Sequence, residues 1–169
     1  DGSYGVTILN NGKYGWDKPN DNTLRLSLLY TPRTNKSFSY QDRQDLGFHT
    51  FTYGIVGHPG QLDKALAVKQ STILNSPIKA FLSERHSGDL ERTFSFVSSD
   101  NPNVIVRALK KSEVGDDYIV RVYENVGRLP QKAQLTFAAD IVKAMEADGT
   151  EKTLGEASFS GRTLIVEVK

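Results

Sequence analysis

Short runs of β-forming residues, separated by turn-forming residues, recur along the chain and limit its fold more than any other feature. The first run, YGVTILN at residues 4–10, is apolar and rich in residues that favour strands. The second, TLRLSLL at residues 23–29, alternates apolar and polar residues, which is typical of a strand with one buried face. These two runs predict a hairpin at the start of an all-β chain.

The polar loop between these two strands contains large aromatic residues. Asn11 and Gly12 favour a tight turn, because both residue types tolerate a positive φ angle. Tyr14 and Trp16 follow, where a plain connection would carry polar side chains. Each ring either packs back on the sheet or is displayed to a partner. We favour packing on the domain's own sheet for Trp16, and both alternatives stay open for Tyr14.

A third alternating run, LGFHTFTYGIVGH at residues 46–58, predicts another strand. Because side chains alternate across a strand, His49 falls on the same face as Phe51 and Tyr53. We therefore expect His49 to be a buried imidazole with a backbone partner, rather than a metal or substrate ligand.

Residues 61–74, QLDKALAVKQSTIL, form the one helix that the sequence predicts. Asn75, Ser76 and Pro77 end it, because a proline disfavours helical geometry in the residue before it. Further strands are expected at residues 77–83 and 92–99. The residues expected to lie on one side of the helix are Leu62, Ala65, Leu66, Lys69 and Ile73.

Four turn-forming residues at 99–102, Ser-Asp-Asn-Pro, give the best candidate for a domain boundary. We therefore expect one domain over residues 1–99 and another over residues 100–169. In the second, short strands recur at regular intervals, a pattern typical of a small antiparallel, immunoglobulin-like sandwich. Its expected strands lie in VIVRALKK, DYIVRVYENVG, KAQLTFAA, a run near DIVKAMEA, and RTLIVEVK.

Composition narrows the possible partners and leaves the cellular compartment unknown. The formal net charge of +1 gives no field that would attract nucleic acid or an anionic membrane. No run approaches the roughly 20 apolar residues of a membrane span. The chain has no cysteine, so it cannot form disulfides or thiolate metal sites. Cytoplasmic and periplasmic locations are both compatible with these features.

The sequence predicts no self-contained active site and no metal site. The three histidines, His49, His58 and His86, do not form the helical pair that many zinc enzymes use. No pair of carboxylates has sequence support for the spacing of about 5 Å that a retaining glycosidase needs. Arg121, Tyr123 and Glu124 are polar residues at the end of an expected strand, and we favour an interface role for them over catalysis.

Three ordered stretches resemble the C-terminal region of glycoside hydrolase family 38, the retaining α-mannosidases. They are GVTILNNGKYGWD, LRLSLL and DLGFHTFTYGIVGHPG. The similarity is greatest to the subgroup with cytosolic, vacuolar and many bacterial members. Two later stretches, SDNPNVIVRALKKSE and VRVYENVG, resemble the family's final β-sandwich. Tyr30 departs from the pattern, because the subgroup usually has Arg there. The matching residues are Leu9, Asn10, Lys13, Tyr14, Gly15, Leu24 to Leu29, Pro32, Asp45, Gly47, His49, Phe51, Tyr53, His58 and Gly60.

This resemblance implies that the chain is one part of a larger enzyme. Residues 1–99 would be the C-terminal part of a galactose-mutarotase-like β-supersandwich, and residues 100–169 a small terminal β-sandwich. An N-terminal catalytic domain of the same parent chain would be the partner. It would supply the nucleophile, the acid/base and a site for zinc or another divalent metal. No catalytic residue and no cofactor is expected in this chain, and the α-mannoside would be reached only through the parent.

The resemblance also suggests that the first loop approaches the rim of the parent's active site. The residues expected there are Asn10, Lys13, Tyr14, Gly15 and Tyr30. Tyr14 would stack on a sugar, because an aromatic ring offers a rigid apolar face. Lys13 or Asn10 would donate hydrogen bonds to sugar hydroxyls or to the catalytic domain.

The same sequence supports two further hypotheses, one on function and one on oligomeric state. The alternative function is an independent carbohydrate-binding β-sandwich. Apolar surface left uncovered without the parent would also allow two copies to pair into a homo-oligomer.

Overall fold

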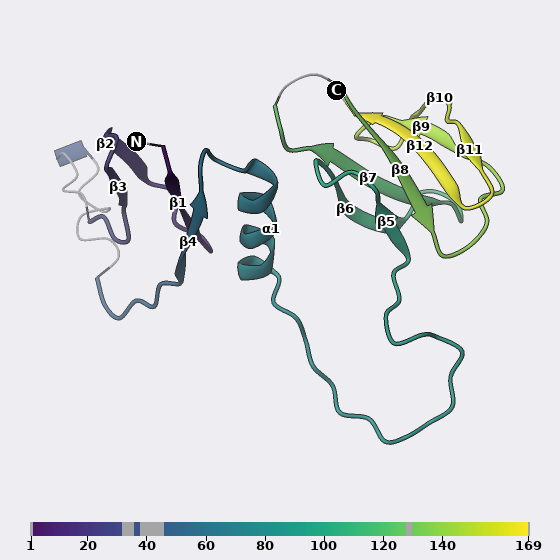
Figure 1. Ribbon diagram of the computed structural model, residues 1–169, viewed down its shortest axis with the longest axis horizontal. Coiled ribbons are helices and arrows are strands. Elements are labelled where there is room, and N and C mark those ends of the chain that lie inside the picture. The colour runs from purple at the N-terminus through teal and green to yellow at the C-terminus, as the bar shows by residue number, and fades with distance from the viewer. Residues whose placement is uncertain (1, 32–35, 38–45, 128–129, 169) are drawn as a thin grey trace. The chain divides into compact units, whose positions relative to one another are not determined.

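The computed structural model describes residues 2–31, 36–37, 46–127 and 130–168 and divides into two compact units, residues 1–79 and 80–169 (Figure 1). Nearly all regular structure is antiparallel strand, and the described residues contain a single α-helix among the labelled elements. The predicted all-β class with one short helix is therefore confirmed.

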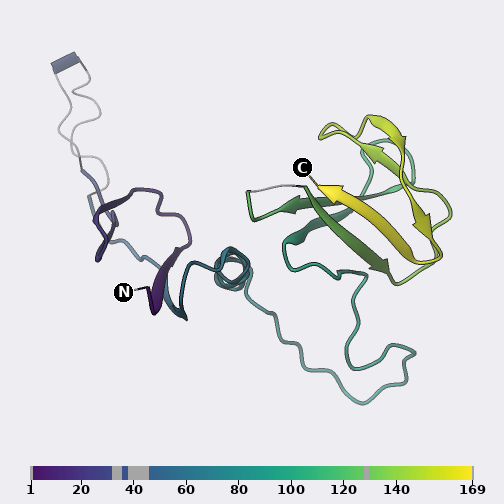
Figure 2. The same ribbon diagram turned by 45° about the horizontal axis from the view of Figure 1, so that its top comes forward.

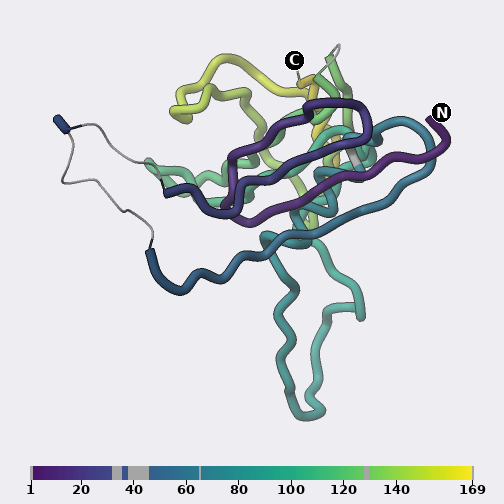
Figure 3. Tube along the Cα trace, turned by 90° about the vertical axis from the view of Figure 1, so that its left-hand side faces the viewer, coloured from purple at the N-terminus to yellow at the C-terminus, as the bar shows by residue number. Residues whose placement is uncertain are grey.

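In the described part of the first unit, the strands form two separate two-stranded sheets. Strand β1 (Tyr4–Asn10) pairs with β4 (Tyr53–Pro59), and the two run side by side in Figure 3. Strand β2 (Trp16–Asn20) pairs with β3 (Thr23–Leu26). The predicted pairing of the first run with residues 23–29 is wrong, because β2 takes that place. Strand β2 was missed because all five of its residues are exposed, so it has no apolar alternation.

The two faces of the β1–β4 sheet differ in their exposure. Helix α1 (Lys64–Asn75) lies against both strands, and the buried face carries Leu9 and His58. Gly5 stands opposite His58 in the register, and a Cβ atom at Gly5 would lie 2.3 Å from His58 Cε1. The sheet can therefore hold this imidazole only because residue 5 is glycine. The opposite face exposes Tyr4, Val6, Tyr53 and Ile55.

The predicted helix is present, but its buried side differs from the prediction. Helix α1 begins after Asp63, whose side chain accepts a hydrogen bond from the Leu66 backbone N–H at 3.1 Å. It ends where Ser76 N–H donates to the Thr72 carbonyl, one residue before Pro77. Leu62 and Ile73 are exposed, whereas the partly buried residues of the helix include Leu66, Gln70 and Leu74.

Three expectations for the apolar runs need correction. Residues 77–83 form no strand, and of residues 92–99 only β5 (Val97–Ser99) is a strand. A strand needs a partner, and none of the described strands pairs with residues 77–83. In the third run pairing starts only at Tyr53. His49 is therefore exposed and stacked on Phe51 at 5.8 Å between ring centroids, instead of buried.

The second unit has the layered organisation of a sandwich. One sheet has the strand order β11-β12-β8-β5, and two further pairs, β6–β7 and β9–β10, complete the unit. Strands β8 and β12 run side by side in Figure 2. The remaining bounds are β6 Val104–Lys111, β7 Tyr118–Glu124, β8 Gln131–Phe137, β9 Met145–Ala147, β10 Thr153–Glu156, β11 Phe159–Ser160 and β12 Thr163–Val168.

The core of the second unit lies between these strands. Val104 on β6 and Leu135 on β8 are almost fully buried, and Ala133 and Leu164 are buried as well. Strand β5 pairs with β8, so residues 97–99 belong to the sheet of this unit. The compact units divide at residue 79, whereas the predicted domains divide at residue 99; the domain assignment itself stays a prediction.

Candidate substrate-rim loop

The loop at residues 10–15 starts with a side chain that shapes the backbone. Asn10 ends β1, and its side-chain oxygen accepts hydrogen bonds from the backbone N–H groups of Gly12 (3.0 Å) and Lys13 (2.8 Å). This is the geometry of an Asx turn. Gly12 has a φ angle of +136°, in the region where glycine is favoured. The turn expected at Asn11 and Gly12 is therefore present, and Asn10 directs it.

Lys13 is directed toward its own unit. Its ammonium nitrogen lies 4.3 Å from the centroid of the Phe51 ring, and its side chain is half-buried. A cation over an aromatic face is attracted by the negative charge density of that face. Lys13 therefore anchors the loop to the segment that leads into β4.

Gly15 fixes the other end of the loop. Its carbonyl accepts a hydrogen bond from the Ser27 backbone N–H at 2.9 Å, which continues the β2–β3 pairing by one residue. A Cβ atom at residue 15 would lie 3.0 Å from Ser27 Cβ. Glycine at this position thus permits the close approach of the two segments.

Tyr14 lies between these fixed residues and points into solvent. Its side chain is 87% exposed, and that of Tyr30, which follows β3, is 75% exposed. Trp16 is 42% exposed and stands opposite Leu26 in the β2–β3 register. Of the five predicted rim residues, Asn10, Lys13 and Gly15 thus build the loop. Tyr14 and Tyr30 present their rings.

Sequence reasoning missed two residues that hold this loop. The side-chain nitrogen of Asn75 donates to the Asn10 carbonyl at 3.1 Å and to the Ser71 carbonyl at 2.9 Å. The ring of Phe51 makes the cation–π contact with the Lys13 ammonium group. The sequence indicates only that Asn75 helps to end the helix. Because 65 residues separate it from Asn10, no local pattern could have revealed the contact.

Known proteins with similar sequences belong to the family that these motifs resemble. Residues 103–169 match the family model described as the C-terminal beta sandwich domain of glycosyl hydrolases family 38. Over 127 residues, 73% of the chain, the sequence is 35% identical to alpha-mannosidase G of Dictyostelium discoideum. This chain belongs to glycoside hydrolase family 38 and corresponds to the C-terminal region of its members.

Two mammalian relatives extend the comparison. Over 127 residues, again 73% of the chain, it is 31% identical to alpha-mannosidase 2C1 of Mus musculus and 28% identical to alpha-mannosidase 2C1 of Homo sapiens. The chain spans only 11% to 12% of the length of these curated relatives. Its two units therefore correspond to a small part of such a family 38 protein.

The described residues of this chain do not fit a site for zinc or another divalent metal, which the resemblance assigns to a catalytic domain of the parent. Within these ranges, no three or more His, Asp or Glu side chains lie close enough together to hold a metal ion. His58 is buried beside Gly5, His49 stacks on Phe51, and His86 lies beside the Ser87 carbonyl.

Among the residues that the structure describes, no helix is long and apolar enough to cross a bilayer.

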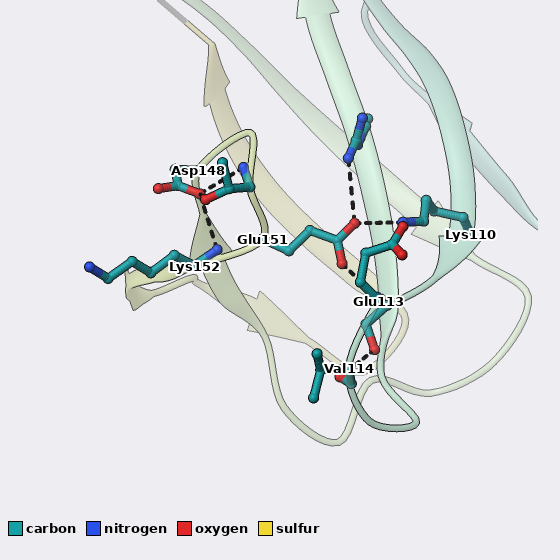
Figure 4. A network of polar contacts seen from close by, with 9 residues as sticks. Lys110, Glu113, Val114, Asp148, Glu151 and Lys152 are labelled. Atoms are coloured by element: carbon teal, nitrogen blue, oxygen red, sulfur yellow. Dashed lines mark hydrogen bonds and ion pairs between the residues drawn. The ribbon is translucent and has the colours of Figure 1, made fainter.

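A second cluster of polar side chains joins two strand pairs of the small sandwich (Figure 4). The Glu151 carboxylate accepts from Lys110 Nζ at 2.6 Å, from the Glu113 backbone N–H at 2.8 Å and from Arg121 at 3.4 Å. The hydrogen bond from Lys110 lowers the pKa of Glu151, with help from the Glu113 backbone. The hydrogen bonds to Glu113 and Glu151 raise the pKa of Lys110.

These contacts clarify the polar residues at the end of β7. Arg121 reaches Glu151, and Glu124 accepts from the backbone N–H groups of Val126 and Gly127, both at 2.8 Å. Both side chains thus stabilise turns of their own unit. An interface role for them and for Tyr123 stays a prediction.

Proposed function

We propose that this chain is the non-catalytic C-terminal part of a retaining, zinc-dependent α-mannosidase. The observation that carries this proposal is the similarity to three α-mannosidases, of which the chain spans about a ninth. The catalytic residues and the divalent metal would then belong to an N-terminal catalytic domain of the parent chain. This chain would support that domain and contribute a loop to the active-site rim.

The shape of the loop at residues 10–15 supports the rim role. A sugar ring has an apolar face that stacks on an aromatic ring, and an aromatic ring offers a large, rigid contact area. Tyr14 presents such a ring from a backbone that is held on both sides. Asn10 and Lys13 shape the loop through the Asn10 side-chain oxygen and the Lys13 contact with Phe51, and the Asn10 amide nitrogen and the Lys13 ammonium are the groups that would donate to sugar hydroxyls or to the catalytic domain.

The exposed face of the β1–β4 sheet supports a docking role toward the parent. A two-stranded sheet is marginal by itself, and it gains stability when a further layer covers its apolar face. Here Tyr4, Val6, Tyr53 and Ile55 form that face, on the side opposite the buried Leu9 and His58. We therefore propose that the parent chain covers it.

An independent carbohydrate-binding module is the second candidate, and the exposed rings of Tyr14 and Tyr30 favour it. Calorimetric titration of the isolated chain with mannose and mannobiose separates the two functions. The proposed function predicts no saturable binding, whereas saturable binding would support the independent module.

An activity assay tests the enzymatic assignment. We expect the full-length protein that carries this chain to hydrolyse p-nitrophenyl α-mannoside and to lose activity on chelation of its metal. The isolated chain should be inactive with or without added zinc. Zinc-dependent turnover by the isolated chain would overturn the non-catalytic role. Absence of turnover by the full-length protein would overturn the α-mannosidase assignment.

A further inference from the structure

We infer that Asn75 and Phe51 are positioning residues for Tyr14, an inference that rests on the proposed rim role of this tyrosine. Neither residue lies in the loop that they hold. Asn75 is the last residue of α1, and Phe51 precedes β4. Each makes one contact with the loop, and the two contacts reach its first and fourth residues.

Asn75 ties the start of the loop to a fixed helix end. Its side-chain nitrogen donates both to the Ser71 carbonyl inside α1 and to the Asn10 carbonyl. The helix is capped at its start by Asp63 and closed at its end by Ser76. The Asn10 backbone is thus held both by α1 and by the β1–β4 sheet.

Phe51 holds the residue that immediately precedes Tyr14. The Lys13 ammonium lies over the Phe51 ring, while the Lys13 backbone N–H is bonded to the Asn10 side chain. Gly15, on the other side of Tyr14, is bonded to Ser27. Tyr14 is therefore a single residue between two anchored neighbours. Release of the Lys13 side chain from Phe51 would leave only the Lys13 backbone bond to Asn10 to hold that side of Tyr14.

The expected effect of losing either contact is weaker substrate binding with unchanged chemistry. A loop that is less ordered would spend less time with the Tyr14 ring in the stacking position. Because the contact is made with bound substrate as well as in the transition state, its loss raises KM and leaves kcat largely unchanged. The loss cannot exceed that of removing the ring itself, roughly twofold to tenfold for one aromatic contact.

Steady-state kinetics of the full-length protein on p-nitrophenyl α-mannoside test this inference. Phe51→Leu removes the aromatic face but keeps apolar bulk, whereas Phe51→Tyr keeps the face. Asn75→Asp removes the donor at nearly constant size. Tyr14→Ala removes the ring, and Tyr118→Ala is the matched control, because Tyr118 is a similarly exposed tyrosine of the second unit. Circular dichroism and melting temperature verify that each variant is folded.

We expect F51L and N75D each to raise KM, F51Y to restore it, and Y118A to leave it unchanged. In the Y14A background, F51L and N75D should have no further effect, because they act through the ring that is already missing. Y14A without effect would overturn the rim role together with this inference. An effective Y14A with inert F51L and N75D, or with effects that add fully, would overturn the positioning role alone.

Discussion

Glu151 has a backbone conformation that side chains rarely adopt. Its φ angle is +68°, and it is the sole non-glycine residue with a positive φ in the described part of the chain. It lies in the turn at residues 148–152, where Asp148 N–H donates to the Lys152 carbonyl and Glu151 N–H to the Asp148 carbonyl. Glycine or asparagine usually occupies such a position. The contacts with Lys110, Glu113 and Arg121 offset this strain.

Replacing Glu151 by glycine should therefore destabilise the chain less than replacing it by alanine. Both changes remove the carboxylate, but Glu151→Gly also removes the steric cost of the positive φ, which Glu151→Ala keeps. The measurement is the melting temperature of the three proteins. A melting temperature for E151A equal to that of the wild type would show that the carboxylate contributes no stability.

Gly5→Ala should lower the free energy of unfolding by about 1–3 kcal/mol, because a Cβ atom at Gly5 would overlap the buried His58 ring. Gly57→Ala is the matched control: it lies on the partner strand, and its Cβ would meet nothing within 4 Å. Urea denaturation measures both. If the cause is the imidazole, Gly5→Ala should cost much less in a His58→Ala background. An equal cost in both backgrounds would contradict this cause.

At the scale of elements, Glu151 joins the β9–β10 turn to the β6–β7 pair, and this link depends on pH. The folded-state pKa of Glu151 is lowered from its ordinary value of 4.5, chiefly by the hydrogen bond from Lys110. Its contribution to stability is therefore complete above the unfolded pKa and is lost as the pH falls through the folded pKa. Lys110 has a raised pKa, so its contribution is lost only at high pH, above its ordinary value of 10.5.

Urea denaturation of the wild type and Glu151→Gln at several pH values measures this link. The difference in unfolding free energy should be largest near neutral pH and should shrink below about pH 4.5. Subtracting the variant cancels the contributions of Asp17, Asp21 and Asp148, whose pKa values are also lowered. A difference that stays constant down to about pH 3 would exclude the carboxylate as its source.

The sequence predicted an element correctly where the residues of that segment alone determine its structure. The runs at residues 4–10, 104–111 and 163–168 carried β-forming or alternating residues, and each is a strand. Strand β2 is exposed throughout, so it gave no such signal. Residues 77–83 carried the signal but have no partner strand among the described residues, and pairing cannot be deduced from one segment.

The candidate site shows the same limit. The sequence resemblance selected the KYG segment, but it could not separate the ring that is displayed from the residues that hold it. Hydrogen bonds from Lys13 or Asn10 to sugar hydroxyls or to the catalytic domain stay a prediction. The structure adds that the two side chains also contact Phe51 and the loop backbone. Asn75 and Phe51 are distant in sequence from this segment, so only the fold brings them to it.

At the scale of the whole molecule, the two units should differ in local stability. In the second unit, Val104, Ala133, Leu135 and Leu164 are buried, whereas Leu9 is the one buried apolar residue among those described in the first. Backbone amides that exchange only by opening a packed core exchange slowly. Hydrogen exchange of the isolated chain should therefore show slow amides in β6, β8 and β12 and faster exchange in β1 and β4. Equal protection in both units would contradict this difference.

The uncovered face of the β1–β4 sheet should make the isolated chain associate as its concentration rises. Light scattering should show a growing mean mass, and Ile55→Lys should reduce it by placing a charge in the apolar face. Lys18→Glu is the control, because Lys18 lies on the exposed strand β2, outside this face, and its replacement should leave the association unchanged. A strictly monomeric chain at high concentration would count against a large docking face.

Trp16 gives the first unit its own optical reporter. It is the only tryptophan in the sequence, it is partly exposed, and it lies two residues from Tyr14. Indole emission shifts to shorter wavelength when the ring leaves water, so the tryptophan fluorescence of this chain reports on the surroundings of the loop at residues 10–15 without any label. In the isolated chain, this one native residue should therefore keep its emission when mannose is added, and a shift to shorter wavelength would reveal a sugar bound near the loop.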